Sequence, residues 1–263
     1  MRWLKKVWLK IWNKIKYLFG KREMEIEKTI NKWFEKTENA LDNLDSERKN
    51  TNLYFLIVNS LPTFGNYLHT AIMILNWERR LPAKALLRVS GQLVSRVSWV
   101  LKGKDDQEQQ NRLKCWIKDS YVKKRRFYNE ILEYYTGEEK AQIEESIRVY
   151  SEEIDKLEKC NIKELPQPKK VFEQAFGKSN IVSGMYSQYH DSVHPDLLVL
   201  TGTIREDGEM TMCEGDTEEN IDDLKFECLI QVYIFFKEIH KFYDLDFQEI
   251  ENGFQVISKS FIQ

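Results

Sequence analysis

The stretch TNLYFLIVNSLPTFGNYLHTAIMILN, Thr51 to Asn76, contains no charged residue and decides the fold that we expect. By length alone it is able to cross a membrane. Polar residues and Pro62 interrupt it near the middle, and proline is unfavourable inside a helix because it lacks the backbone N–H. We therefore predict that the stretch forms two buried helices of a protein core, which meet at Leu61-Pro62.

The composition of the 263-residue chain is that of a globular protein with a large core. Charged residues make up 31% and hydrophobic residues 42%, and the low counts of 11 Gly and 5 Pro disfavour a turn-rich β architecture. With 40 Lys and Arg against 42 Asp and Glu, the formal charge of -2 excludes a bulk attraction to nucleic acid. We expect an all-α helical bundle.

Helical patterns continue after the core stretch. A helix is predicted from Leu81 to Lys102, because Pro82 suits a first helical turn. Asp105 to Cys160 predicts two long charged helices separated at Thr136-Gly137, and the acidic second helix is expected to pair with the basic first one. Two closing helices are expected at residues 217–243 and 247–261.

Two further segments complete the predicted organisation. The β pattern of Leu198 to Cys213, with a turn at Glu206-Asp207-Gly208, predicts a small β-hairpin. Glu23 to Lys49 combines dense mixed charge with a narrow apolar seam, which predicts an exposed helix. We therefore divide the chain into an N-terminal helical arm, residues 1–50, and a helical domain, residues 51–263.

The first 22 residues form a basic amphipathic pattern without an acidic residue. Apolar and aromatic residues recur at helical spacing, which is typical of a helix lying in a membrane interface. Docking on a partner protein and clamping of nucleic-acid phosphates are the alternatives. The contact residues that we expect are Trp3, Lys5, Lys6, Trp8 and Trp12.

The densest chemical signal is NIVSGMYSQYHDSVHPDLLVL, Asn180 to Leu200, which holds two of the four histidines of the chain. In a helix that ends at Pro195, Tyr186, His190 and His194 share one face with Ser183 and Ser187. Such a titratable stripe suits acid–base chemistry near neutral pH. Alternatively, the histidines cap their own helix end, where an imidazolium interacts well with the helix dipole.

The predicted helix of residues 81–102 carries a second polar face. Arg88, Gln92, Ser95 and Trp99 recur at one-turn spacing, apart from the leucines and valines of the buried side. An arginine in this apolar setting either extends to the surface or directs its guanidinium into a site. We expect Arg88 and Gln92 to line one cavity with Tyr186, His190 and His194.

A basic run, Lys123-Lys124-Arg125-Arg126, is flanked by Tyr121, Phe127 and Tyr128. Basic residues interleaved with aromatic ones are able to bind an RNA backbone and stack on bases. The alternative is a solvated helix face with local salt bridges. We treat the four basic residues as candidate substrate-binding residues.

The cysteines and the N-terminus indicate the expected compartment. The 4 Cys are far apart without a CxxC pair, which predicts free thiols in a reducing environment. No signal-peptide pattern is visible, so a cytoplasmic location is expected, with peripheral contact at the inner membrane face through residues 1–22. We expect no cofactor, and we leave homo-oligomerisation open.

The two polar stretches resemble a family of bacterial all-helical proteins of unknown function. In that family an Arg, followed by an acidic residue one turn later, faces a Tyr/Ser/His cluster that ends in His-Pro. The matching stretches here are LLRVSGQLVSRVSW, Leu86 to Trp99, and MYSQYHDSVHPDLL, Met185 to Leu198. The resemblance covers roughly residues 51–263, and Gln92 stands where the family has the acidic residue.

That family is similar in layout to HEPN proteins, helical domains common in toxin and phage-defence ribonucleases. This resemblance implies a bacterial stress or phage-defence effector that cleaves RNA without metal. HEPN nucleases carry an Arg four to six residues before the His, whereas no Arg lies in the ten residues before His194. Arg88 would therefore supply the cation from another helix.

Two alternatives to this activity stay open. His190 and His194 present two imidazoles as in metallohydrolases, but HExxH is absent because Asp191 follows His190. A metal site would need Asp191, Asp196 or a distant Glu, and we expect none. The other alternative is a non-enzymatic module that binds a membrane or a partner and has a structural His/Tyr cluster.

Overall fold

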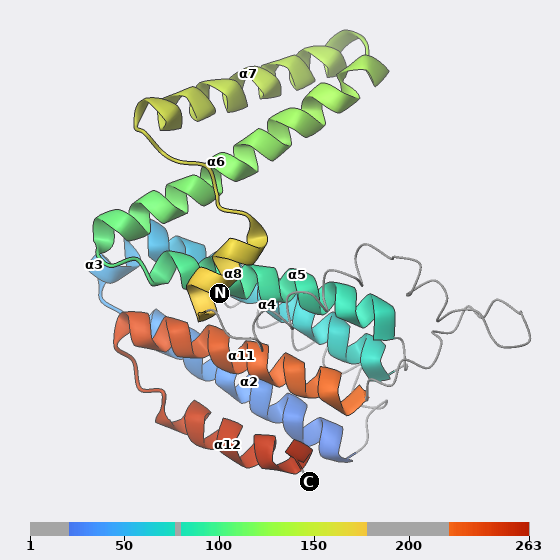
Figure 1. Ribbon diagram of the computed structural model, residues 1–263, viewed down its shortest axis with the longest axis vertical. Helices are drawn as coiled ribbons and strands as arrows, with labels where there is room; N and C mark the ends of the chain where they lie inside the picture. Colours follow the sequence, from blue (N-terminus) through green and yellow to red (C-terminus); the bar gives the residue numbers. More distant parts are fainter. Residues whose placement is uncertain (1–20, 77–79, 178–220, 263) are drawn as a thin grey trace, which may run out of the picture.

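The computed structural model describes residues 21–76, 80–177 and 221–262, and these ranges contain helices and no strand (Figure 1). The predicted all-α class is confirmed for this part of the chain. The predicted β-hairpin at residues 198–213 lies outside it. The elements are α2 (Lys21–Asp42), α3 (Ser46–Lys49), α4 (Asn52–Asn76), α5 (Arg80–Leu101), α6 (Asp106–Ile131), η1 (Leu132–Tyr134), α7 (Gly137–Lys159), α8 (Pro168–Phe176), α11 (Ile221–Tyr243) and α12 (Gln248–Ile262).

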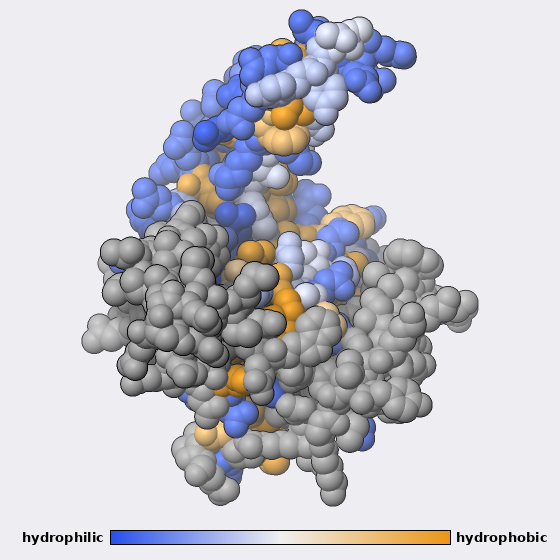
Figure 2. All heavy atoms as spheres, turned by 90° about the vertical axis from the view of Figure 1, so that its right-hand side faces the viewer, coloured by the Kyte–Doolittle hydropathy of each residue, from blue (hydrophilic) through white to orange (hydrophobic). Residues whose placement is uncertain are grey.

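These helices form a bundle and a projecting arm (Figure 1). The bundle consists of α2, α4, α5, α11 and α12, with α8 packed on α5. The arm is the hairpin of α6 and α7, in which α7 packs back along α6 as predicted. Figure 2 shows hydrophilic residues over most of the arm, with hydrophobic residues gathered in small patches.

Helix α4 supplies the centre of the bundle core. Its apolar residues recur at helical spacing and are almost completely buried: Ile57, Leu61, Phe64, Leu68, Ala71 and Leu75. The Phe64 ring lies 6.2 Å from the Phe34 ring of α2 and 4.6 Å from the Phe235 ring of α11, measured between centroids. The uncharged stretch is thus a protein core, as expected. No helix in the described ranges is long and apolar enough to cross a membrane.

The predicted break at Leu61-Pro62 was wrong, because α4 is continuous and contains Pro62. An interior proline costs about 3 kcal/mol, whereas burying one large apolar side chain contributes about 1.5–3 kcal/mol. Leu61, Phe64 and Leu68, on either side of the proline turn, are each at most 3% exposed. Burial of one continuous face therefore outweighs the local cost.

Helix α2 is part of the same core. Ile30, Trp33, Phe34 and Leu41 are buried together with core residues of α4, α5 and α11. The helix predicted at Glu23 to Lys49 was expected to be exposed, but α2 packs into the core. The expected boundary at residue 50, between the helical arm and the helical domain, lies between parts of the chain that share this core. The pattern of α2 showed a narrow apolar seam but not the partner that covers it.

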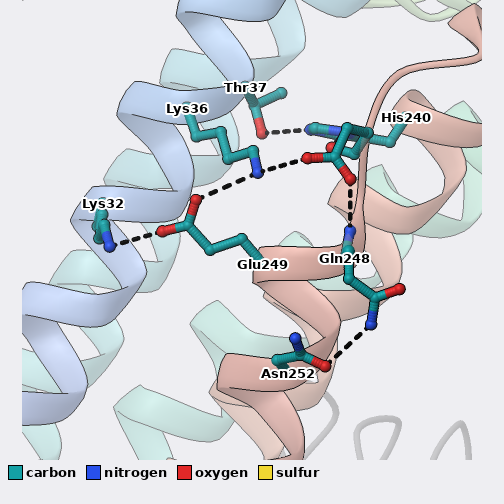
Figure 3. A network of polar contacts seen from close by, with 8 residues as sticks. Lys32, Lys36, Thr37, His240, Gln248, Glu249 and Asn252 are labelled. Carbon is teal, nitrogen blue, oxygen red and sulfur yellow. Dashed lines mark hydrogen bonds and ion pairs between the residues drawn. The ribbon is translucent and has the colours of Figure 1, made fainter.

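A polar network, buried at His240 and exposed at its ion pairs, connects α2 with α11 and α12 (Figure 3). His240 is fully buried, its Nδ1 lies 2.9 Å from the Asp246 carbonyl oxygen, and its Nε2 lies 3.0 Å from Thr37 Oγ1. Because a carbonyl oxygen only accepts, Nδ1 donates and the neutral ring accepts from the threonine hydroxyl at Nε2. Beside them, Lys36 Nζ donates to Asp246 at 3.1 Å and to Glu249 at 3.2 Å. Both ring nitrogens have partners, which indicates a structural role for His240.

Candidate functional site

The polar face predicted for residues 81–102 divides into two parts on α5. Arg88 and Gln92 are half-buried, whereas Ser95 and Trp99 are buried. Helix α8 packs on this part of α5, and Trp99 Nε1 donates a hydrogen bond to Gln174 Oε1 at 2.8 Å. Trp99 therefore has a structural partner, and the part of the face that reaches the surface is the turn from Arg88 to Gln92.

Buried hydrogen bonds set the register of α11 against this turn of α5. Ser90 Oγ donates to Gln231 Oε1 at 2.5 Å, and Gln231 Nε2 donates to the Leu87 carbonyl oxygen at 3.1 Å. Ser90 and Gln231 are almost completely buried. A buried side chain that both accepts and donates across a helix pair holds the two helices in one relative position. Residues one turn from Gln231 consequently face the first turns of α5.

Glu227, one turn before Gln231, brings a carboxyl group to this position. Its Oε1 atom is buried and has no hydrogen-bond partner. Burial raises the pKa of Glu227 to about 8, and the Lys84 ammonium group on α5 opposes this shift. Lys84 lies one turn before Arg88. Helices α5 and α11 thus bring two cationic residues and a carboxyl group that is mostly protonated at neutral pH to one end of the bundle.

The pKa of Glu227 predicts an unusual pH dependence of stability. A carboxyl group whose folded pKa lies above its unfolded value of about 4.5 stabilises the fold at low pH, and this contribution is lost as the pH rises towards 8. Between pH 5 and pH 8 the loss is on the order of 3 kcal/mol.

Glu227→Gln, which cannot ionise, is therefore expected to gain stability relative to the parent over this range. Urea denaturation at several pH values measures the difference. Glu173→Gln on α8 is the control, because Glu173 is likewise half-buried. A constant difference between parent and Glu227→Gln at all pH values would contradict the raised pKa.

His69 adds a titratable group from α4. Its side chain is half-buried, and burial lowers the pKa of the imidazole, which favours the neutral ring. Helices α4 and α5 are consecutive and antiparallel (Figure 1). His69 near the end of α4 and Arg88 near the beginning of α5 therefore lie in the same half of the bundle.

The remaining residues of the predicted cluster, Tyr186, His190 and His194, lie outside the described residues. They belong to the segment that joins α8 to α11, and both of these helices contact α5. The expected convergence of His190 and His194 with Arg88 stays a prediction. The expected contact residues Trp3, Lys5, Lys6, Trp8 and Trp12 also lie outside the described ranges.

The basic run lies in the second half of α6, in the arm and not in the bundle (Figure 1). Lys123 Nζ contacts Asp119 at 2.8 Å, and Arg126 Nε contacts Glu130 at 2.8 Å, each one turn away in the same helix. Lys124 Nζ lies 5.6 Å from the centroid of the Tyr150 ring on α7. Local salt bridges are thus present, but they leave these cations at the surface.

The cysteines that the structure describes form no disulfide, as expected. Cys115, Cys160 and Cys228 are free thiols, and Cys213 lies outside the described part. Among residues 21–76, 80–177 and 221–262, no group of three His, Cys, Asp or Glu side chains is arranged to hold a metal ion.

Sequence reasoning overlooked Glu227 and Lys84. A signal was present, because Glu227 lies in the apolar run LKFECLI of α11, where a carboxylate is costly to bury. Comparison of the chain with models of known families, with curated proteins and with solved structures finds no match. The bundle end and the arm are therefore the parts of the molecule that indicate a function.

Proposed function

We propose that the chain is a bacterial stress or phage-defence effector, an HEPN-like endoribonuclease that acts without a metal ion. The observation that carries the proposal is the polar end of the bundle, where the Lys84 ammonium group of α5 acts on the Glu227 carboxyl group of α11 and Arg88 follows one turn after Lys84. A buried carboxyl group with a strongly raised pKa beside a cation is typical of functional sites. The family resemblance directs the proposal to RNA.

The chemistry suggests roles for the predicted site residues and for Lys84. Cleavage through the 2′-hydroxyl needs a base for its proton, an acid for the departing 5′-oxygen and a cation for the charge on phosphorus. His190 and His194 act as base and acid, Arg88 binds the phosphate, and Tyr186 orients it. Gln92 lies one turn after Arg88 and offers an amide to the same group. Lys84 adds a second positive charge, which attracts the anionic substrate.

The test is cleavage of single-stranded RNA by the purified chain in the presence of EDTA. We expect cleavage by the parent and a loss of about 10²-fold or more in Arg88→Ala, because a cation aimed at the transition state contributes at least that much. Arg112→Ala is the matched control. Its guanidinium pairs with the Glu108 carboxylate at an N···O distance of 2.7 Å, and its Cζ lies 5.3 Å from the centroid of the Trp99 ring, away from the bundle end. Equal rates for both variants would refute the role of Arg88.

A non-enzymatic module is the second candidate function, and the arm favours it. A hairpin that projects from the bundle with aromatic side chains at the surface suits a partner protein. Contact of residues 1–22 with a cytoplasmic membrane surface, and association with a second copy of the chain, belong to this proposal. In this case the His/Tyr cluster is structural, as His240 is in the described part.

A further inference from the structure

The aromatic residues around the basic run of α6 fall into two groups. The Tyr121 and Tyr128 rings lie 5.6 Å and 5.9 Å from the Tyr150 ring and hold α7 against α6. Phe127 and Tyr134 are instead 55% and 75% exposed. Helix packing accounts for the first pair. The second pair presents two large rings to solvent, with Phe127 directly after the basic run and Tyr134 eight residues after Arg126, in η1.

The positive charge of the arm is concentrated on α6. This helix has seven Lys and Arg against four Asp and Glu, a formal charge of +3, whereas α7 has four against eight, a formal charge of -4. The Lys123 and Arg126 side chains are 63% and 81% exposed. Their ion pairs within the helix are worth only about 0.3–0.5 kcal/mol, so a phosphate group is able to replace either carboxylate.

The spacing of the two exposed rings suits stacked bases. Phe127 and Tyr134 are seven residues apart, which corresponds to roughly 10–12 Å along α6 and η1. Seven residues are also close to two helical turns, so the two positions lie on nearly the same side of the helix that α6 and η1 form. Successive nucleotides of a stacked strand rise about 3.4 Å, so the rise along the helix axis between the two positions corresponds to about three nucleotide steps.

We propose that Lys123, Arg126, Phe127 and Tyr134 form a binding surface for single-stranded RNA on the arm. The two rings stack on bases, and the two cations contact phosphates. A duplex is excluded from this mode because its base faces are already stacked. The inference rests on the proposed function and deepens it, since it separates the surface that holds the substrate from the bundle end that cleaves it.

The experiment measures the fluorescence anisotropy of a short labelled single-stranded RNA titrated with the full chain in EDTA. To prevent cleavage, the RNA carries 2′-O-methyl groups throughout in a parallel titration. The double variant Phe127→Ala/Tyr134→Ala is expected to weaken binding by at least about 30-fold, because each of the two base–aromatic stacks is worth about 1–3 kcal/mol. Lys123→Ala/Arg126→Ala should weaken binding. It should also make the plot of the logarithm of the association constant against the logarithm of the salt concentration less steep, by about 1–2 in slope.

Two variants serve as matched controls. Arg148→Ala removes an exposed cation of α7 that contacts Glu145, and Phe55→Ala removes an aromatic ring of the bundle that is 53% exposed. Both should bind RNA as the parent does. Far-UV circular dichroism checks that all variants keep the helical fold, as expected for substitutions at exposed positions.

The outcomes separate this inference from the proposed nuclease. If the parent chain binds RNA through both rings but never cleaves it, the proposed nuclease function is refuted and the proposed RNA-binding surface is supported. Normal RNA affinity of the ring variants, in a parent that cleaves, would overturn the surface alone. A parent that binds no RNA, or binds a duplex equally well with and without the rings, would also overturn it and leave a protein partner as the occupant of the arm.

Discussion

Replacement of Phe64 by alanine is expected to lower the free energy of unfolding by about 3–5 kcal/mol. Phe64 is completely buried at the centre of α4, and its ring contacts rings of both α2 and α11. The substitution removes the transfer free energy of the ring and leaves a cavity that three helices must collapse to fill. Urea denaturation followed by circular dichroism measures the loss.

Phe55→Ala is the matched control, because Phe55 lies on the same helix and is 53% exposed. We expect it to change the free energy of unfolding by less than about 1 kcal/mol. Similar losses for the two variants would show that α4 does not form the centre of the core.

His194→Ala is expected to reduce RNA cleavage by about 10²–10⁴-fold while leaving the melting temperature nearly unchanged. A positioned acid or base contributes a factor of this size to the rate. A histidine that only interacts with the end of its helix contributes at most about 2 kcal/mol to stability. Melting temperature and cleavage rate, measured on the same preparation, therefore separate catalysis from capping.

Asp191→Asn is the control for the metal alternative. A zinc site built on His190 and His194 needs a further ligand, and Asp191 is the nearest carboxylate in the sequence. In the metal-free mechanism this variant keeps its activity, and EDTA does not inhibit the parent. Loss of activity on addition of EDTA, restored by zinc, would replace the proposed mechanism with a metal-dependent one.

Local signals were sufficient for the break between the arm helices and for the start of α5, but they missed the break between α2 and α3 and the whole of α8. Thr136-Gly137 marked the break between the arm helices, and the structure places Gly137 at a φ of 60°, a left-handed conformation that glycine adopts without strain. Pro82 likewise marked the first turn of α5. The break predicted at Pro62 was wrong. The local free-energy cost of a proline in a helix does not include the burial of the apolar side chains before and after it, which keeps α4 continuous.

Which residues meet across helices was harder to predict. Helical spacing predicts that Arg88 and Gln92 share a polar face, and the structure leaves both half-buried on α5, while their role in a site stays a prediction. Glu227 and His240 were missed, because periodicity does not show which polar residue of an apolar helix faces a neighbour and which partner it finds there. The positions of Tyr186, His190 and His194 relative to Arg88 stay predictions for the same reason.

The most direct test of the central claim compares an RNA oligonucleotide with its DNA counterpart of the same sequence. Both are incubated in EDTA with the parent chain, and the products are separated by length. Because the proposed mechanism uses the 2′-hydroxyl as the nucleophile, we predict that the RNA is cut, that its products carry 2′,3′-cyclic phosphate ends, and that the DNA stays intact. An RNA that stays intact at high protein concentration, with and without EDTA, would contradict the nuclease.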